Sequence, residues 1–301
     1  MISFDFYSPE QKISLPRWQE RFIHVTIKRD DMIHPFISGN KWRKLKFNIN
    51  KALELHKNQL VTFGGAWSNH LLATACAGAT FGFKTTAFLR ADEGINNPVI
   101  AMCKLFGMEL IYTNRADYKD KQTLFDKHFA TNPNAYFIDE GGYGMDGAKG
   151  CEEIVTSLTQ TYDHIFCACG TGTTLAGIQH AVDTLKLNTK VHGIPVLKGG
   201  EFIQEEIQKI YPETKPVTLH TGYHFGGYAR TQPTLLQFIE KFVSSSGIMI
   251  EPTYTGKLFF AIDDLISKDY FEPNANILVI HTGGLTGFLG MYDRFNLDLN
   301  Q

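Results

Sequence analysis

Short apolar runs alternate with segments of helical periodicity from about residue 59 onward. The strand-like runs are residues 59–63, 84–89, 109–112, 135–138, 164–168, 191–196 and 277–281. Between them, apolar side chains recur at helical spacing in residues 68–80, 98–106, 117–129, 147–161 and 175–187. Strands joined through helices by short connections predict parallel sheets covered by helices on both faces.

This alternation predicts an α/β protein with two domains, each a twisted, mostly parallel sheet flanked by helices. We expect a large domain built from residues 1–45 plus 153–301, and a small domain, residues 46–152, inserted into it. A chain of 301 residues with 43% hydrophobic residues can fill two such cores. Ligands of such folds bind beyond the carboxyl ends of the strands, so we expect the site in the cleft between the domains.

Composition narrows the class of protein. The net charge of -2 gives no reason to expect a nucleic-acid partner, and no apolar run reaches membrane-spanning length. The first ten residues lack the basic and apolar regions of a signal peptide, so we expect a cytoplasmic protein. The five cysteines are scattered and odd in number, which predicts buried, reduced thiols and neither disulfides nor a metal site.

A loop rich in glycine and threonine follows the apolar run at 164–168. It contains Gly170, Thr171, Gly172, Thr173 and Thr174. Glycines let successive N–H groups point at one place, and the helix that follows adds positive partial charge. The loop therefore predicts a phosphate cradle, with an ordinary capped turn as the alternative. It matches neither the nucleotide-phosphate loop nor the dinucleotide fingerprint.

Two further segments are candidates for chemistry. Lys41 and Lys44 follow a Gly-Asn turn and share one helix face, so one amine can form an imine while the other lowers its pKa or pairs with a phosphate. A solvated surface is the alternative. In residues 64–70, Ser68 or Asn69 can cap a helix whose free N–H groups suit a carboxylate, and a plain cap is the alternative there.

Taken together, five segments resemble one enzyme family. They are residues 39–45 (GNKWRKL), 64–70 (GGAWSNH), 171–177 (TGTTLAG), 252–257 (PTYTGK) and 281–284 (HTGG). In this order they are similar to pyridoxal-phosphate (PLP) enzymes of the tryptophan-synthase-β fold type II, in the group of 1-aminocyclopropane-1-carboxylate (ACC) deaminases and D-cysteine desulfhydrases. The resemblance spans about residues 30–290.

The resemblance implies a role for each matching position. Around the cofactor, Lys41 binds PLP as an imine, Lys44 and residues 170–174 hold its phosphate, Asn69 faces its phenolic oxygen, Thr282 lies near its pyridine nitrogen and Thr255 lies beside it. Around the substrate, Ser68, Asn69 and His70 receive the carboxylate, while Tyr254 and Tyr228 line the reacting side. Either Lys41 or Tyr254, if its pKa is lowered, then removes the α-proton.

Two threonines indicate which reaction this chain catalyses. ACC deaminases typically carry Glu and Leu where this chain has Thr255 and Thr282, as the desulfhydrases do. A neutral threonine makes the cofactor a milder electron sink, which suits β-elimination. We therefore expect D-cysteine to be converted to pyruvate, ammonia and hydrogen sulfide by a homodimeric enzyme. ACC deamination, or PLP binding without turnover, are the alternatives.

The chain also departs from the group near the substrate side. Leu71-Leu72 stands where the group often has an arginine two places after Ser-Asn-His, and residues 227–231 differ from the group's Gly-Tyr-Gly-x-Pro-like loop. These differences affect the choice of substrate more than the binding of the cofactor.

Overall fold

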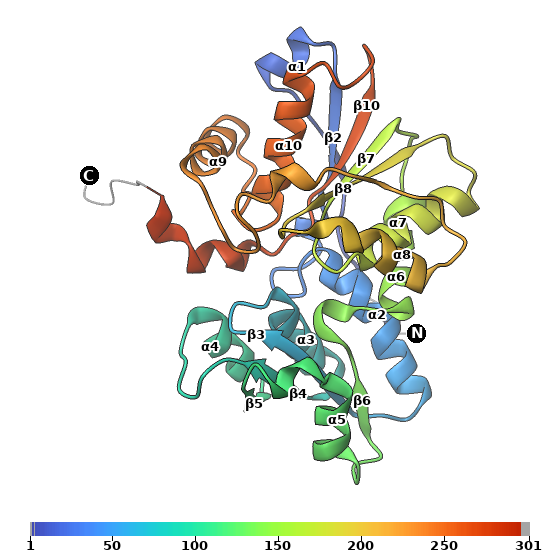
Figure 1. Cartoon of the computed structure of the whole chain (residues 1–301). Helices are drawn as coiled ribbons and strands as arrows, with labels where there is room; N and C mark the ends of the chain where they lie inside the picture. Colours follow the sequence, from blue (N-terminus) through green and yellow to red (C-terminus); the bar gives the residue numbers. More distant parts are fainter. Residues whose placement is uncertain (1, 3, 296–301) are drawn as a thin grey trace.

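The computed structural model describes residue 2 and residues 4–295, which form two sheets (Figure 1). The six-stranded sheet has the order β1-β2-β10-β7-β8-β9, and the four-stranded sheet has the order β5-β4-β3-β6. In the described residues every strand pair is parallel except the antiparallel pair β1–β2. The predicted α/β class, with mostly parallel sheets between helices, is confirmed.

The large sheet brings the two ends of the chain together. Its strands are β1 (Glu10–Ile13), β2 (His24–Lys28), β7 (His164–Cys169), β8 (Lys190–Pro195), β9 (Thr218–Leu219) and β10 (Asn276–Ile280). Strand β2 pairs with β10, so Val25 lies opposite Ile277. One face packs on α1 (Pro16–Glu20), α9 (Pro233–Ser246) and α10 (Thr255–Ser267). The other packs on α6 (Met145–Thr156), α7 (Thr173–Thr184) and α8 (Ile203–Ile210).

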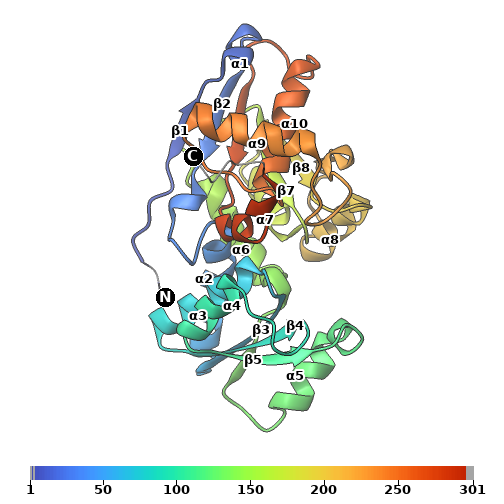
Figure 2. The ribbon, with the colours of Figure 1, turned by 90° about the vertical axis from the view of Figure 1, so that its left-hand side faces the viewer.

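The small sheet is likewise covered on both faces. Its strands are β3 (Gln59–Gly65), β4 (Lys84–Arg90), β5 (Met108–Thr113) and β6 (Ala135–Phe137). Helices α2 (Asn40–Glu54), α3 (Asn69–Phe81) and α4 (Pro98–Leu105) cover the face toward the large sheet, and α5 (Lys121–Phe129) covers the other (Figure 2). Apolar side chains point to both faces, as a buried parallel sheet requires.

Helices α2 and α6 join the two parts of the molecule. Trp42 and Leu45 of α2 pack in one cluster with Leu60 of the small sheet. On α6, a Cβ at Gly150 would lie 1.8 Å from the carbonyl oxygen of Arg43, so glycine permits the close helix contact. The predicted domain boundary after residue 45 falls inside α2, and the division into domains stays a prediction.

The sequence placed most elements of residues 59–196 correctly and missed several others. The helix expected at 147–161 ends at Thr156, and beyond it the carboxylate of Glu10 in β1 accepts from the N–H of Thr159 and the hydroxyl of Tyr162, which holds that segment in a non-helical bend. Sequence analysis predicts nothing for β1, β2, α8, α9 or α10, although Leu235, Ile239 and Phe242 give α9 a helical apolar stripe. No helix in the described part of the chain is long and apolar enough to cross a membrane.

Candidate active site

The loop before α2 is pressed against the loop after β10. Gly39 has a φ of 62°, and a Cβ there would lie 1.7 Å from the carbonyl oxygen of Thr282. The N–H of Asn40 donates to the same oxygen over 3.3 Å. Glycine is therefore required at position 39 both by its backbone conformation and by this contact. The contact brings Lys41, from near one end of the chain, beside Thr282, from near the other.

Lys41 and Lys44 lie one turn apart at the start of α2, as predicted. Within the described residues neither amine makes a hydrogen bond, and Lys44 is buried. Burial, reinforced by the charge of Lys44, lowers the pKa of Lys41 to about 7, and burial also lowers the pKa of Lys44. A large share of Lys41 is then an uncharged amine at neutral pH, which imine formation needs.

The glycine-threonine loop has the geometry of an anion cradle. Gly172, with a φ of 80°, caps the N-terminus of α7. In the part of the chain that the structure describes, none of the N–H groups of residues 170–174 has an acceptor within the chain. The hydroxyls of Thr171 and Thr173 lie 3.1 Å apart, and Thr174 Oγ1 accepts a 2.9 Å bond from the side chain of Asn40. That last bond fixes the loop beside Lys41.

The loop after β3 ends in the N-terminus of α3. Ser68 caps this helix, since its hydroxyl accepts from the N–H of Leu71 over 3.3 Å. The N–H groups of Asn69 and His70 have no acceptor in the described chain, so they are available to a carboxylate. The side chain of Asn69 is bound by the hydroxyl of Thr286, which places it against the loop after β10.

His70 lies inside the protein and faces away from solvent. Its Nε2 lies 2.8 Å from Thr62 Oγ1, and its Nδ1 is a buried atom without a partner. Burial and the charges of Lys41 and Lys44 hold its pKa well below the usual value, so the ring is neutral. The side chain of His70 is therefore not the group that would contact a substrate carboxylate. Contact through its backbone N–H stays a prediction.

Tyr254 and Tyr228 stand together over the phosphate loop. The hydroxyl of Tyr254 is 3.5 Å from where a Cβ on Gly170 would be, and the two tyrosine rings meet edge to face with centroids 6.0 Å apart. Burial raises the pKa of the Tyr254 phenol well above its usual value, whereas the side chain of Tyr228 is 54% exposed. The condition under which Tyr254 would be the base, a lowered pKa, is therefore not met in this site.

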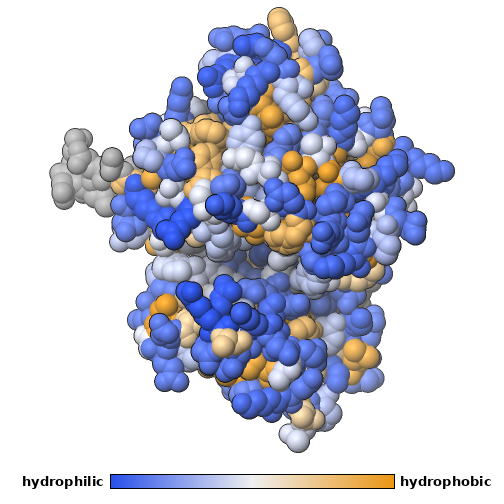
Figure 3. Space-filling view, in the orientation of Figure 1, coloured by the Kyte–Doolittle hydropathy of each residue, from blue (hydrophilic) through white to orange (hydrophobic). Residues whose placement is uncertain are grey.

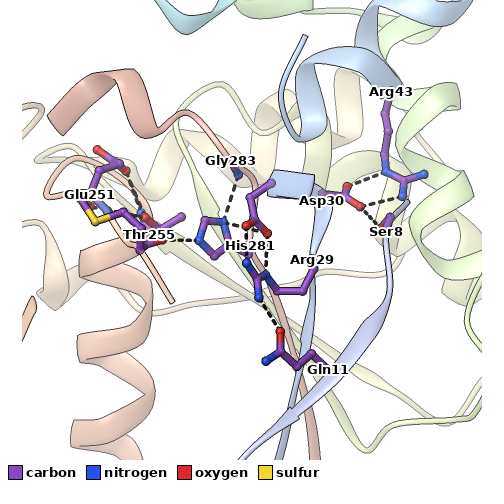
Figure 4. Close-up of polar contacts among 11 residues, drawn as sticks. Ser8, Gln11, Arg29, Asp30, Arg43, Glu251, Thr255, His281 and Gly283 are labelled. Carbon is purple, nitrogen blue, oxygen red and sulfur yellow. Dashed lines mark hydrogen bonds and ion pairs between the residues drawn. The ribbon is translucent and has the colours of Figure 1, made fainter. Parts of the chain in front are cut away.

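Thr255 and Thr282 are both buried but differ in what they contact. The hydroxyl of Thr255 accepts a 2.9 Å bond from the N–H of Glu251. In turn, the Glu251 carboxylate accepts from the N–H groups of residues 253, 254 and 255 over 2.6–3.0 Å. Figure 4 shows Glu251 beside Thr255. The hydroxyl of Thr282 makes no hydrogen bond within the described residues. A cofactor contact of Thr255, which is already engaged, stays a prediction.

Three charged residues that sequence analysis missed support the site. Asp30 forms a fully buried, two-bond ion pair with Arg43 of α2, at 2.6 and 2.7 Å (Figure 4). Glu251 holds the turn that carries Tyr254. Lys257 donates to three backbone carbonyls beneath the loop that carries Tyr228. Of these three, Lys257 lies inside a segment that resembles the family (residues 252–257), and that position is the signal that could have found it.

These features fit PLP. The free N–H groups of residues 170–174 suit a phosphate, and the weakly basic amine of the half-buried Lys41 suits an aldehyde. The fold and this site define a PLP enzyme of fold type II. The chain belongs to the family of pyridoxal-phosphate dependent enzymes, whose model matches residues 4–283.

Relatives with known names agree with this family. The bifunctional D-cysteine desulfhydrase/ACC deaminase of Arabidopsis thaliana, a mitochondrial protein, is 30% identical over 89% of this chain and 73% of its own. D-cysteine desulfhydrase of Salmonella newport is 28% identical over 86% of each chain. The crystal structure of an ACC deaminase homologue superposes with a TM-score of 0.85 at 30% identity, over 95% of this chain and 92% of that one. The predicted enzyme class, family and cofactor are confirmed.

Proposed function

We propose that the protein catalyses α,β-elimination from a small D-amino acid and that D-cysteine is a substrate. D-Cysteine and water would give pyruvate, ammonia and hydrogen sulfide. The observation that carries this proposal is the weakly basic amine of the half-buried Lys41 beside an N–H cradle, with the neutral hydroxyl of Thr282 where a carboxylate would make a stronger electron sink. The names of the relatives support the same reaction.

In this proposal each residue has a defined task. PLP, when bound, supplies the electron sink that weakens bonds at the substrate Cα. Residues 170–174 and Lys44 hold its phosphate, and Thr282 bonds its ring nitrogen. The N–H groups of Asn69 and His70 orient the substrate carboxylate, with Ser68 fixing the turn that presents them.

Lys41 is the base in this proposal. With a pKa of about 7, its amine can accept the α-proton at neutral pH, whereas the raised pKa of Tyr254 keeps that phenol protonated. The neutral phenols of Tyr254 and Tyr228 then act as hydrogen-bond donors toward the departing group. The leaving thiolate takes the electrons of the Cβ–S bond.

A second candidate is ACC deamination, which the names of two relatives favour. The neutral Thr255, which stands where ACC deaminases typically carry Glu, speaks against it as the main reaction, because ring opening offers no good leaving group to take up the electrons. We also propose a homodimer in the cytoplasm. The five free, buried cysteines suit a reducing compartment, and the oligomeric state is to be measured by light scattering.

One experiment tests the function and the lysine assignment together. The PLP-loaded protein is screened against D-cysteine, L-cysteine, ACC, D-serine and β-chloro-D-alanine, with pyruvate and sulfide as readouts. Borohydride reduction followed by peptide mapping should place the cofactor on Lys41, and Lys44→Gln should leave that site of labelling unchanged. Faster turnover of ACC than of D-cysteine would reject the proposed reaction, and a label on another lysine would reject the role of Lys41.

A further inference from the structure

A cavity lies at the carboxyl edge of the small sheet, beside the candidate active site. Its volume is about 570 Å³, and it is lined by Arg90, Arg115, Tyr118, Lys119, Lys121 and Glu140. Arg90 ends β4, while Arg115 follows β5 and Glu140 follows β6. Since these strands are parallel, their carboxyl ends meet at the edge where α/β folds bind ligands.

This cavity adjoins the candidate active site on two sides. A Cβ on Gly65, the last residue of β3 before the turn to Ser68, would lie 3.9 Å from an Nη of Arg90. A Cβ on Gly141, next to Glu140, would lie 3.9 Å from Cγ2 of Thr171 in the phosphate loop. Figure 3 shows a hollow between the two lobes, with strongly hydrophilic side chains along its lower border. A substrate in the active site can therefore extend into the cavity.

The cavity has more positive than negative charge. Lys121 is neutralised by Asp139 and Glu140, at 3.0 and 3.6 Å. Arg115 and Lys119 make neither an ion pair nor a side-chain hydrogen bond in the part of the chain that the structure describes. The guanidinium of Arg90 lies over the ring of Tyr118, 5.0 Å from its centroid, and leaves its N–H groups without a carboxylate.

Tyr118 adds a buried donor to these cations. Its side chain is 4% exposed, and its hydroxyl is a buried atom with no hydrogen-bond partner among the described residues. Burial, together with the nearby carboxylate of Glu140, raises its pKa, so the hydroxyl keeps its proton. Leaving such a group unpaired costs stability, and an anionic oxygen is the partner that a phenol and guanidinium groups together bind best.

We propose that this cavity binds an anionic group on the side chain of the substrate, so that the enzyme prefers small amino acids with a phosphate or sulfate ester at Cβ. The inference rests on the proposed elimination. With O-phospho-D-serine, Lys41 takes the α-proton and the Cβ–O bond breaks. Phosphate leaves with the electron pair, and water converts the released aminoacrylate to pyruvate and ammonia.

Calorimetry with unreactive ligands tests the cavity without turnover. PLP-loaded protein is titrated with D-2-amino-3-phosphonopropionate and with D-alanine. The phosphonate is not eliminated, because its C–P bond does not break under these conditions. We expect the phosphonate to have a Kd at least tenfold lower at low salt. The double variant Arg115→Gln/Lys119→Gln should remove this preference. Lys104→Gln, which changes an exposed lysine at the end of α4 outside the cavity, should keep it.

The outcomes separate this inference from the proposed function. If D-cysteine yields pyruvate but both ligands bind equally, the cavity inference is overturned and the function stands. If no amino acid yields pyruvate while the preference for the phosphonate persists, the proposed function is overturned and the anion-binding cavity stands. Inorganic phosphate that binds as tightly as the phosphonate would indicate a separate anion site and overturn the assignment to the substrate side chain.

Discussion

The ammonium of Lys257 lies 2.8 Å from the carbonyl oxygen of Gly227, the residue before Tyr228. Its other two bonds go to the carbonyls of His224 and Val196, at 2.9 and 3.0 Å. The loop that contains His224, Gly227 and Tyr228 is strained, because Phe225 and Ala229 both have positive φ. A single buried cation thus ties this loop to the end of β8 and sets the position of Tyr228.

Replacing Lys257 with Met should loosen that loop. We expect kcat for D-cysteine to fall about tenfold or more, because Tyr228 loses its fixed position, while the PLP content remains near one per chain. Methylammonium added to the variant should restore part of the activity by occupying the three carbonyls. Lys268→Met, at an exposed lysine after the same helix, is the matched control. Unchanged kcat in a folded Lys257→Met protein would contradict this role.

The buried carboxylate of Glu251 changes what a substitution at Thr255 is expected to do. In Thr255→Glu, a second carboxylate would lie beside Glu251, whose own pKa burial already raises. We expect a loss of about 2 kcal/mol or more in the free energy of unfolding, from the burial of two like charges.

Adding Glu251→Gln to Thr255→Glu should recover part of that loss, and urea unfolding of the two variants measures it. The double change Thr255→Glu/Thr282→Leu should therefore raise the ratio of ACC to D-cysteine kcat/KM only in the background that carries Gln at 251. An equally stable Thr255→Glu protein would refute the conflict between the carboxylates.

The phosphate loop can be tested at Gly172. Gly172→Asp puts a charged side chain into the cradle at a residue with left-handed backbone conformation. The new Cβ would lie 3.3 Å from Cγ2 of Ile203. We expect the Kd for PLP to rise at least about a hundredfold, because the carboxylate repels the phosphate. Gly199→Asp is the matched control, since Gly199 also has positive φ but nothing within 4 Å of a Cβ. Equal PLP affinity of the two folded variants would remove the loop from the phosphate site.

A row of histidines makes stability depend on pH. His192 lies 2.9 Å from His164 and 3.1 Å from His220, and burial lowers its pKa to about 2 from a usual 6.5. The folded chain keeps this ring neutral while the unfolded chain binds a proton below pH 6.5. Stability is therefore full above about 6.5 and falls as the pH drops toward 2, by at most about 1.4 kcal/mol per pH unit for this group.

Urea unfolding at pH 7, 6 and 5 measures that slope. His192→Gln should give a shallower fall between pH 7 and 5, since it has no ring to protonate in the unfolded state. His24→Gln, at an exposed histidine outside the row, is the matched control. If the slopes of the wild type and His192→Gln coincide, the histidine row does not contribute to acid sensitivity.

The elements that could be predicted are those whose pattern is local. Strands β3 and β4 are apolar runs bounded by polar or glycine residues, and α3 has a serine cap, so sequence reasoning found each within two residues. Strand β1 has the pattern of an exposed edge, with only Glu10 and Ile13 partly covered, and its pairing with β2 decides its structure. Such strands are specified by their partners more than by their own residues.

The same distinction applies to the candidate site. Lys41 and residues 170–174 stand out because turn, loop and helix start are encoded together in short segments. Asp30, Glu251 and Lys257 look like ordinary surface charges in the sequence, and only the packing of distant segments buries them. The cavity around Tyr118 could not be predicted either, since the residues that line it lie at or after the ends of three separate strands.

The contact of Gly39 with the Thr282 carbonyl has a consequence for biosynthesis. The reactive lysine emerges from the ribosome early, but the loop that completes its surroundings emerges only after β10 near the end of the chain. We therefore expect that a nascent chain does not retain PLP until almost all of it has been made and β10 has paired with β2. Cofactor binding should therefore report that the chain has been completed. A protein truncated before residue 282 should not bind PLP and should lack the visible absorption of the bound cofactor.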